Sequence, residues 1–243
     1  DSGNWSEGLT TYLADMAYRH DLHEGGLARK EKILEYLSYV KPDTLPLEDF
    51  RSAGHAADNN RASRAVGYGR AALLFHELKL RVGQELFDET IRLFYKKYRG
   101  LDASWKNIQD LFEAASAVDL NRFFADRLSR TDLPDLEVLE IKTRQKTDTG
   151  SLSFTIKQNS AQPFEIMLPF IIKTTLGELD FTRLITEELT DITVDVEGHP
   201  IELIIDGNYD LMRRLSDQEY VPAWSQLMGN SDTTVILADD NEQ

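Results

Sequence analysis

The chain has 243 residues, contains no cysteine and carries a formal net charge of −15. The acidic excess argues against a nucleic-acid partner, because binding to phosphates needs a basic surface. The absence of cysteine excludes disulfides and thiolate metal ligands, and is compatible with the cytoplasm and the periplasm alike. No apolar run reaches the roughly 18 residues that a membrane-spanning helix needs, so we predict a soluble chain without a membrane span in this part.

A short helix is predicted close to the start of the chain. Gly3 and Asn4 give a turn, and the apolar residues after them follow the i, i+3, i+4 spacing of one buried helix face. These residues are Trp5, Leu9, Tyr12, Leu13 and Met16. Glu7 lies in the first turn on the same inward side, where an unpaired carboxylate is costly. Two compensators are possible, the positive end of the helix dipole and a bound metal ion.

A second helix and a long connection follow. Residues 27–40 have helical spacing, and Pro42 ends that helix. The connection covers residues 43–63, and loops of this length inside compact domains are typical of functional segments. It leads into a helix that carries Tyr68 and is apolar on nearly every side over residues 71–74. We therefore expect the Tyr68 helix to be central in the fold.

Two of these stretches resemble the aminopeptidase N family of zinc metallopeptidases, the gluzincins. Residues 5–12, W-S-E-G-L-T-T-Y, resemble the family's W-L-N-E-G-F-A-x-Y segment, in which the Glu is the third zinc ligand. Residues 65–75, A-V-G-Y-G-R-A-A-L-L-F, are similar to its Y-x-K-G-x-x-x-L/F helix start, in which the Tyr stabilises the oxyanion of the tetrahedral intermediate. The resemblance implies that Glu7 is a zinc ligand and Tyr68 the oxyanion stabiliser, with Arg70 in place of the family's Lys.

The family's other two zinc ligands and its general base come from an H-E-x-x-H motif, in which two histidines one helical turn apart reach one ion. The chain has no such motif, because the pairs that begin at His23 and His76 lack the second histidine. In the family the motif lies upstream of the Glu segment, so the resemblance implies the carboxyl-terminal part of a larger peptidase, without its N-terminal part. One carboxylate does not hold zinc, so we expect this fragment alone to be metal-free and inactive.

Three further helices are predicted before the strands. The first of these helices lies between Gly83 and Gly100. Ser104 is expected to be the N-cap of the second helix, and Asp119 the N-cap of the third. Because the links are short, neighbouring helices should pack antiparallel. This succession matches the helical second half of the thermolysin-like catalytic domain that the resemblance implies. Residues 1–133 are predicted to form that half.

Beyond the last helix, the apolar residues change from helical spacing to alternation. Five short alternating segments with turn signals between them predict an antiparallel β-sandwich over residues 134–210. Residues 1–133 have 19 Lys and Arg against 21 Asp and Glu, whereas residues 134–243 have 8 against 21, which also indicates a domain boundary. For residues 211–243 a helical turn from Arg213 and an acidic tail are predicted. The predicted fold class is therefore α+β and multidomain.

Three arginines flank Tyr68 and are candidates for binding a substrate carboxylate: Arg61, Arg64 and Arg70. The alternative is a solvated face of cations near a helix start, which is common in proteins. His20 and His23 have a spacing that metal ligands use. Solvated histidines at the C-terminal end of a helix are favoured by the helix dipole without any metal, and this is the reading we adopt for them.

The intact protein is accordingly predicted to be a zinc metallopeptidase, in the aminopeptidase class that the resemblance implies, with a peptide as its substrate. One alternative is a non-catalytic, peptidase-like scaffold whose β domain binds a protein partner. The upstream sequence separates the two, because the enzyme requires an intact H-E-x-x-H motif. Another alternative is an unrelated helical domain joined to a sandwich with a binding function. That alternative predicts that Glu7 and Tyr68 lie far apart.

Overall fold

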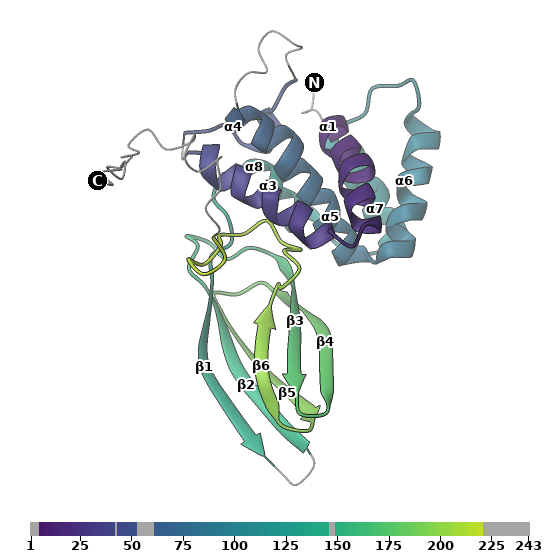
Figure 1. The fold of residues 1–243 in the computed structure, drawn as a ribbon. Helices are drawn as coiled ribbons and strands as arrows, with labels where there is room; N and C mark the ends of the chain where they lie inside the picture. Colours follow the sequence, from purple (N-terminus) through teal and green to yellow (C-terminus); the bar gives the residue numbers. More distant parts are fainter. Residues whose placement is uncertain (1–4, 42, 53–60, 146–148, 221–243) are drawn as a thin grey trace, which may run out of the picture.

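The structure is a computed structural model that describes residues 5–41, 43–52, 61–145 and 149–220. A helical part and a part built of strands are joined by loops (Figure 1). The helical elements are α1 (Trp5–Thr10), η1 (Thr11–Met16), α2 (Ala17–Asp21), α3 (Gly25–Tyr39), η2 (Leu47–Asp49), α4 (Arg61–Arg64), η3 (Ala65–Arg70), α5 (Ala71–Val82), α6 (Gln84–Tyr98), α7 (Trp105–Ser116) and α8 (Asn121–Ser129).

Two continuous helical rods, each made of three consecutive helical segments, contain a π-helical segment. The first rod consists of α1, η1 and α2, and the second rod consists of α4, η3 and α5. Both η1 and η3 are π-helical. Such segments are rare inside α-helices and are frequent at functional sites. They lie in the two regions that the sequence singles out, because η1 begins four residues after Glu7 and η3 contains Tyr68.

The first rod packs directly on the second. A Cβ atom at Gly8 would overlap Ala71, so the two backbones approach as closely as glycine allows. Helix α1 contacts both η3 and α5, and α1 and α4 begin on the same side of the helical part (Figure 1). The prediction that the Tyr68 helix is central agrees with the burial of every residue from Ala71 to Leu78.

The later helices confirm the predicted cap at Ser104 and the buried stripes, whereas the N-cap of α8 is Leu120 and not the predicted Asp119. Ser104 and Asn107 form a capping box, in which the backbone N–H of Asn107 donates to Ser104 Oγ at 3.2 Å and that of Ser104 donates to Asn107 Oδ1 at 2.9 Å. Asp119 Oδ1 accepts a hydrogen bond from the first backbone N–H of α8 at 2.9 Å. The buried faces of α6 and α7 meet where the rings of Phe87 and Phe112 lie 5.5 Å apart.

Residues 43–52 form an anchored connection rather than a free loop. It contains η2, and both Leu47 and Phe50 are fully buried. Helix α4 begins at Arg61, before the predicted end of the connection at Ser63, and residues 53–60 lie outside the described part. The apolar side chains explain the anchoring, because each removes its surface from water.

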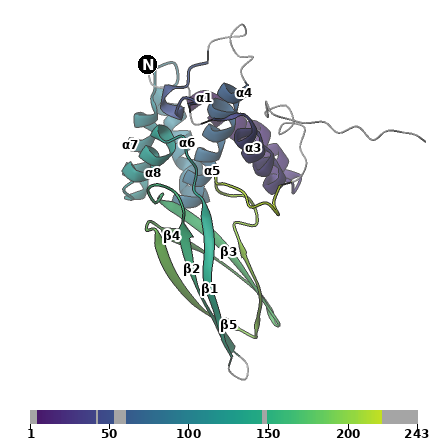
Figure 2. The same cartoon turned by 90° about the vertical axis from the view of Figure 1, so that its left-hand side faces the viewer.

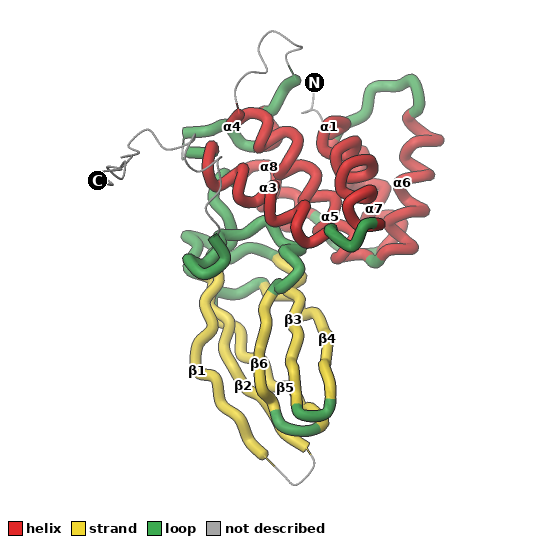
Figure 3. Tube along the Cα trace, in the orientation of Figure 1, coloured by secondary structure: helices red, strands yellow, loops and turns green. Residues whose placement is uncertain are grey.

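The strands form two antiparallel sheets of three, with the orders β1-β2-β5 and β4-β3-β6 (Figures 2 and 3). Their bounds are β1 (Leu136–Gln145), β2 (Thr149–Gln158), β3 (Ile166–Thr174), β4 (Gly177–Ile185), β5 (Leu189–Glu197) and β6 (Pro200–Ile205). Buried and less buried residues alternate along β2 and β3, as a sheet with one covered face requires. Both sheets contribute to one apolar core, in which the rings of Phe154 and Phe170 lie 5.5 Å apart.

The sequence analysis missed β4. This strand lies at the edge of its sheet, pairs with β3 alone and is largely exposed, so its residues lack a clear alternation of apolar and polar side chains. The missed strand explains why five alternating segments were predicted where the structure has six strands.

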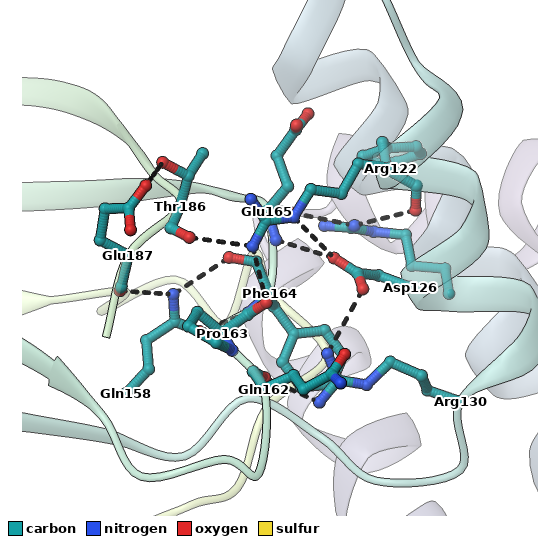
Figure 4. A network of polar contacts seen from close by, with 12 residues as sticks. Arg122, Asp126, Arg130, Gln158, Gln162, Pro163, Phe164, Glu165, Thr186 and Glu187 are labelled. Carbon is teal, nitrogen blue, oxygen red and sulfur yellow. Dashed lines mark hydrogen bonds and ion pairs between the residues drawn. The ribbon is translucent and has the colours of Figure 1, made fainter. Parts of the chain in front are cut away.

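Helix α8 joins the helical part to the loops at the near end of the sheets (Figure 4). The guanidinium of Arg122 donates to the carbonyl oxygens of Pro163 and Thr186 at 2.8 and 2.9 Å. The carboxylate of Asp126 accepts from the backbone N–H of Glu165 at 2.9 Å. These contacts satisfy backbone groups next to β3 and β4 that have no strand partner there.

Residues 211–220 correct one prediction. The segment has a bend and a hydrogen-bonded turn, not the helical turn predicted to begin at Arg213, and residues 221–243 lie outside the described part. Long-range contacts fix the segment instead: the backbone N–H of Met212 donates to Glu77 Oε1 at 3.0 Å, and that of Arg214 to the carbonyl oxygen of Pro134 at 2.9 Å. Among the described residues, no helix is long and apolar enough to cross a membrane.

Candidate functional site

The site proposed from the sequence begins with Glu7 on the first turn of α1. Glu7 is partly buried, and its carboxylate makes no hydrogen bond or ion pair with any other described residue. The acidic position in the first turn is favoured by the helix dipole. The helix dipole is therefore the stabilising interaction of the Glu7 carboxylate, and no described arginine or lysine forms an ion pair with it.

Tyr68 lies in the π-helical segment η3 and is partly buried. Phe50 packs edge-on against its ring at 6.2 Å between centroids, and a Cβ atom at Gly67 would overlap the Phe50 ring. Gly67 thus makes room for the aromatic side chain that supports Tyr68. The guanidinium of Arg64 lies over the Tyr68 ring at 5.3 Å, a distance at which a cation and an aromatic ring attract each other.

The helices that carry Glu7 and Tyr68 are in contact. Gly8, next to Glu7, lies against Ala71, and Tyr68 precedes Ala71 by three residues, or almost one helical turn. The helices that carry the two residues are therefore neighbours, as the metallopeptidase prediction requires. The sequence places these stretches some sixty residues apart, and it is the packing of α1 on η3 and α5 that joins them.

The three candidate arginines are in three different environments. Arg64 is exposed beside Tyr68, as described above. Arg61 is exposed one turn earlier and donates to the hydroxyl of Tyr39 at 2.7 Å. Arg70 is buried with 4% exposure and donates to the hydroxyl of Tyr36 at 2.6 Å. The structure thus places Arg64 next to the ring of Tyr68. Arg70 instead links η3 to α3 through its hydrogen bond with Tyr36.

The described residues hold no group of three or more His, Asp or Glu side chains arranged to bind a metal ion. His20 and His23 lie at and beyond the end of α2, on exposed positions. Of the zinc ligands that the resemblance implies, the described residues contain the carboxylate of Glu7, and a zinc ion bound there would need further ligands.

Sequence reasoning missed a buried ionic cluster on the opposite face of α5. The guanidinium of Arg127 donates to Glu77 Oε2 at 2.9 Å, and both side chains are buried. Next to it, His76 Nε2 donates to Asp210 Oδ1 at 2.8 Å, and Arg29 Nη2 lies 2.9 Å from the same oxygen. The sequence signal for this cluster was the presence of His76 and Glu77 inside an otherwise apolar helix. An unpaired buried charge is unfavourable, so such residues predict buried partners.

Burial sets the protonation of this cluster. It lowers the pKa of His76, against the opposing effect of the Asp210 hydrogen bond. The pKa of Asp210 is lowered as well, because burial is outweighed by the hydrogen bond from His76 and by the nearby Arg29. His76 is therefore neutral and Asp210 ionised near neutral pH, and Arg29 balances the charge of Asp210.

Comparison with solved structures identifies a peptidase-like α+β fold. One similar structure is aminopeptidase A of Legionella pneumophila in complex with aspartic acid, with a TM-score of 0.60 and 18% sequence identity. The similarity covers 92% of this chain and 24% of that chain, so this chain spans about a quarter of the length of that aminopeptidase. No protein-family model and no curated protein matches the chain. At this identity the similarity shows the fold, namely helices and two antiparallel sheets arranged as in part of an aminopeptidase.

Proposed function

We propose that the chain is part of a zinc-dependent metallopeptidase of the aminopeptidase N type, a gluzincin. In this proposal the helices form the helical half of a thermolysin-like catalytic domain, and the two sheets form the β-sandwich that follows it. The observation that carries the proposal is the packing of α1, with Glu7, on the rod of Tyr68, through the contact of Gly8 with Ala71. The peptidase-like fold supports it.

The proposed chemistry gives Glu7 and Tyr68 separate tasks. Glu7 supplies one carboxylate ligand, and a bound zinc ion would polarise the scissile carbonyl and acidify a water molecule. The Tyr68 hydroxyl donates a hydrogen bond to the oxyanion that develops on the carbonyl oxygen. The remaining two ligands and the general base are proposed to come from residues outside this chain, so the chain alone is expected to be inactive.

The proposal also assigns roles to the arginines. Arg64 presents its guanidinium over the ring of Tyr68 and is exposed, which suits contact with a substrate carboxylate. Arg61 lies on the same short helix and is the second candidate. Arg70 was predicted together with them, but its contact with Tyr36 supports a positioning role, because it ties α3 to the π-helical segment of Tyr68.

The proposal is tested on the longest native protein that contains this chain. Aminoacyl-arylamides and short peptides are the substrates, and zinc content is measured in parallel. Tyr68→Phe should lower kcat by about a hundredfold or more with zinc retained, because it removes an oxyanion donor. Glu7→Gln should lower both zinc content and activity. The exposed Tyr95→Phe is the matched control and should leave both unchanged.

The same assay on the 243-residue chain with added zinc should give no turnover. Turnover by this chain that Tyr68→Phe abolishes would contradict the proposed division of the site. Absence of zinc and of turnover in the intact protein would instead favour the non-catalytic scaffold, whose β domain would then be tested for a protein partner.

A further inference from the structure

A separate cavity of about 160 Å³ opens between η1, α2, α3, α5 and α6. Its inner wall is buried and its rim is exposed on α2. Leu13, Met16, Ala17 and Phe87 give it an apolar side, and its polar side consists of Tyr12, His20, Asp21, Arg29, His76, Lys79, Gln84 and Asp88. The volume is several times the roughly 30 Å³ of one liquid water and below the roughly 300–1,000 Å³ of drug-sized sites. It therefore suits a small molecule.

Lys79 supplies a cation to this cavity, and no ion pair joins it to a described residue. Its side chain is partly buried, and its ammonium lies 5.7 Å from the centre of the Tyr12 ring. It makes no hydrogen bond or ion pair with a described residue. Burial, followed by the nearby charge of Arg29, lowers the pKa of Lys79. An anion bound here would relieve the desolvation of this ammonium.

Tyr12 supplies a hydrogen-bond donor beside Lys79. The residue is 8% exposed, and its hydroxyl has no hydrogen-bond partner among the described residues. Its ring is fixed by edge contacts with Phe87 at 5.7 Å and with His76 at 6.0 Å. Burial raises the pKa of the Tyr12 hydroxyl, so it stays protonated. An accessible hydroxyl that lines a cavity and has no partner among the described residues is suited to a ligand oxygen.

Arg29 and His76 complete the wall, and most of their polar atoms are bonded to residues 208–210. Arg29 donates to the carbonyl oxygens of Asn208 and Tyr209 and pairs with Asp210. His76 is neutral and uses its Nε2 hydrogen for Asp210, as shown above. Lys79 and Tyr12 provide further donors on the inner wall, beside the Nη1 group of Arg29.

Asp88 provides the opposite charge at the same cavity. One of its oxygens accepts from the side-chain amide of Gln84 at 2.8 Å, and no described cation pairs with it. Lys79 and Asp88 line one cavity without forming an ion pair across it. A ligand that carries both an anion and a cation would satisfy each of them.

We propose that this cavity binds a free α-amino acid. The carboxylate is bound by the Lys79 ammonium and the Tyr12 hydroxyl, and the α-ammonium by Asp88. The apolar side chain of the amino acid lies against Leu13, Met16 and Phe87. The proposal rests on this cavity alone and is independent of the proposed zinc site at Glu7.

The test is isothermal titration calorimetry of the full 243-residue chain with L-leucine, and with 4-methylpentanoate and 3-methylbutylamine as probes that each lack one of its charged groups. Leucine should bind saturably and more tightly than either probe. Lys79→Met should weaken leucine binding by about tenfold or more, and Tyr12→Phe by about threefold to tenfold. The exposed Lys96→Met and Tyr95→Phe are matched controls and should leave the affinity unchanged.

Asp88→Asn separates the two ends of the ligand. This substitution should weaken the binding of leucine by about tenfold and leave the binding of 4-methylpentanoate unchanged, because only leucine carries the ammonium. Circular dichroism verifies that each variant is folded, and the test is read on folded variants. Absence of leucine binding to the wild-type chain would overturn the proposal, as would equal affinity for 4-methylpentanoate or binding that survives Lys79→Met.

Discussion

The helices and the strands of this chain differ in what they bury. Among the described residues, the helices enclose several charged or ionisable side chains: Arg29, Arg70, His76, Glu77, Asp126 and Arg127. The strands enclose apolar side chains, with Gln158 as their buried polar residue. Beyond β6, Asp206 and Arg213 form a further buried ion pair at 2.6 Å. Buried charges need specific partners, so the helical part depends on matched charges where the sheets depend on apolar packing.

The charged interior of the helices leads to the largest expected effect. Glu77→Gln would leave the guanidinium of Arg127 buried without a counter-ion and should reduce the free energy of unfolding by roughly 3–5 kcal/mol. Urea denaturation measures it. The exposed pair of Lys106 and Asp110 is the control, and Asp110→Asn should change stability by less than about 0.5 kcal/mol. A similar small loss for both variants would remove the distinction drawn between the two parts.

The strand part should respond to volume rather than charge. Leu168→Ala would leave a cavity in the core shared by the sheets and should reduce the free energy of unfolding by roughly 2–5 kcal/mol, with a value near 3 expected. Leu184→Ala, on the exposed edge strand β4, should cost less than about 1 kcal/mol. Equal losses in the two variants would show that the sheets do not share one core.

The support beneath Tyr68 should be sensitive to a single methyl group. Gly67→Ala would push into the Phe50 ring and should reduce the free energy of unfolding by roughly 1–3 kcal/mol. Gly69→Ala is the matched change in the same segment: its nearest neighbour would be Lys32 Cδ at 3.6 Å, an ordinary contact, so stability should be unchanged or increase by about 0.5–1 kcal/mol. Equal destabilisation by both changes would contradict this assignment of strain to Phe50.

The smallest effect is the pH dependence that His76 contributes. Burial lowers the pKa of His76 below its ordinary 6.5, so the unfolded chain takes up the proton first as the pH falls. The stability from neutral His76 is complete above the ordinary pKa and is lost as the pH falls below it, by about 1 kcal/mol between pH about 7 and about 5. Asp210 adds its own loss at lower pH, near the ordinary carboxyl pKa of 3.8 and below.

His76→Asn should flatten the loss between pH about 7 and about 5 in denaturation curves, whereas the exposed His20→Asn should leave it unchanged. An unchanged slope in His76→Asn would show that this histidine is not held neutral by its surroundings.

Much of the helical part follows from local pattern. The spacing of apolar residues predicted α3, α5, α6, α7 and α8, and the cap at Ser104 is as predicted, because helix periodicity and capping depend on residues a few positions apart. The π-helical segments at Tyr68 and after Glu7 were not predictable in this way, since no periodicity marks them. The weakly patterned edge strand β4 and the absence of a helical turn at Arg213 were likewise beyond local rules.

The sequence by itself determined the α+β class, the change of period near residue 134, and two candidate residues, Glu7 and Tyr68, through their resemblance to a peptidase family. The tertiary structure decided that their helices touch, that Arg70 turns inward to Tyr36, and that β2 pairs with β5 rather than with β3. It also decided that Tyr12 and Lys79 share a cavity. The physical reason is that periodicity reports which face of an element is buried, whereas the partner of that face is chosen by packing between residues far apart in the chain.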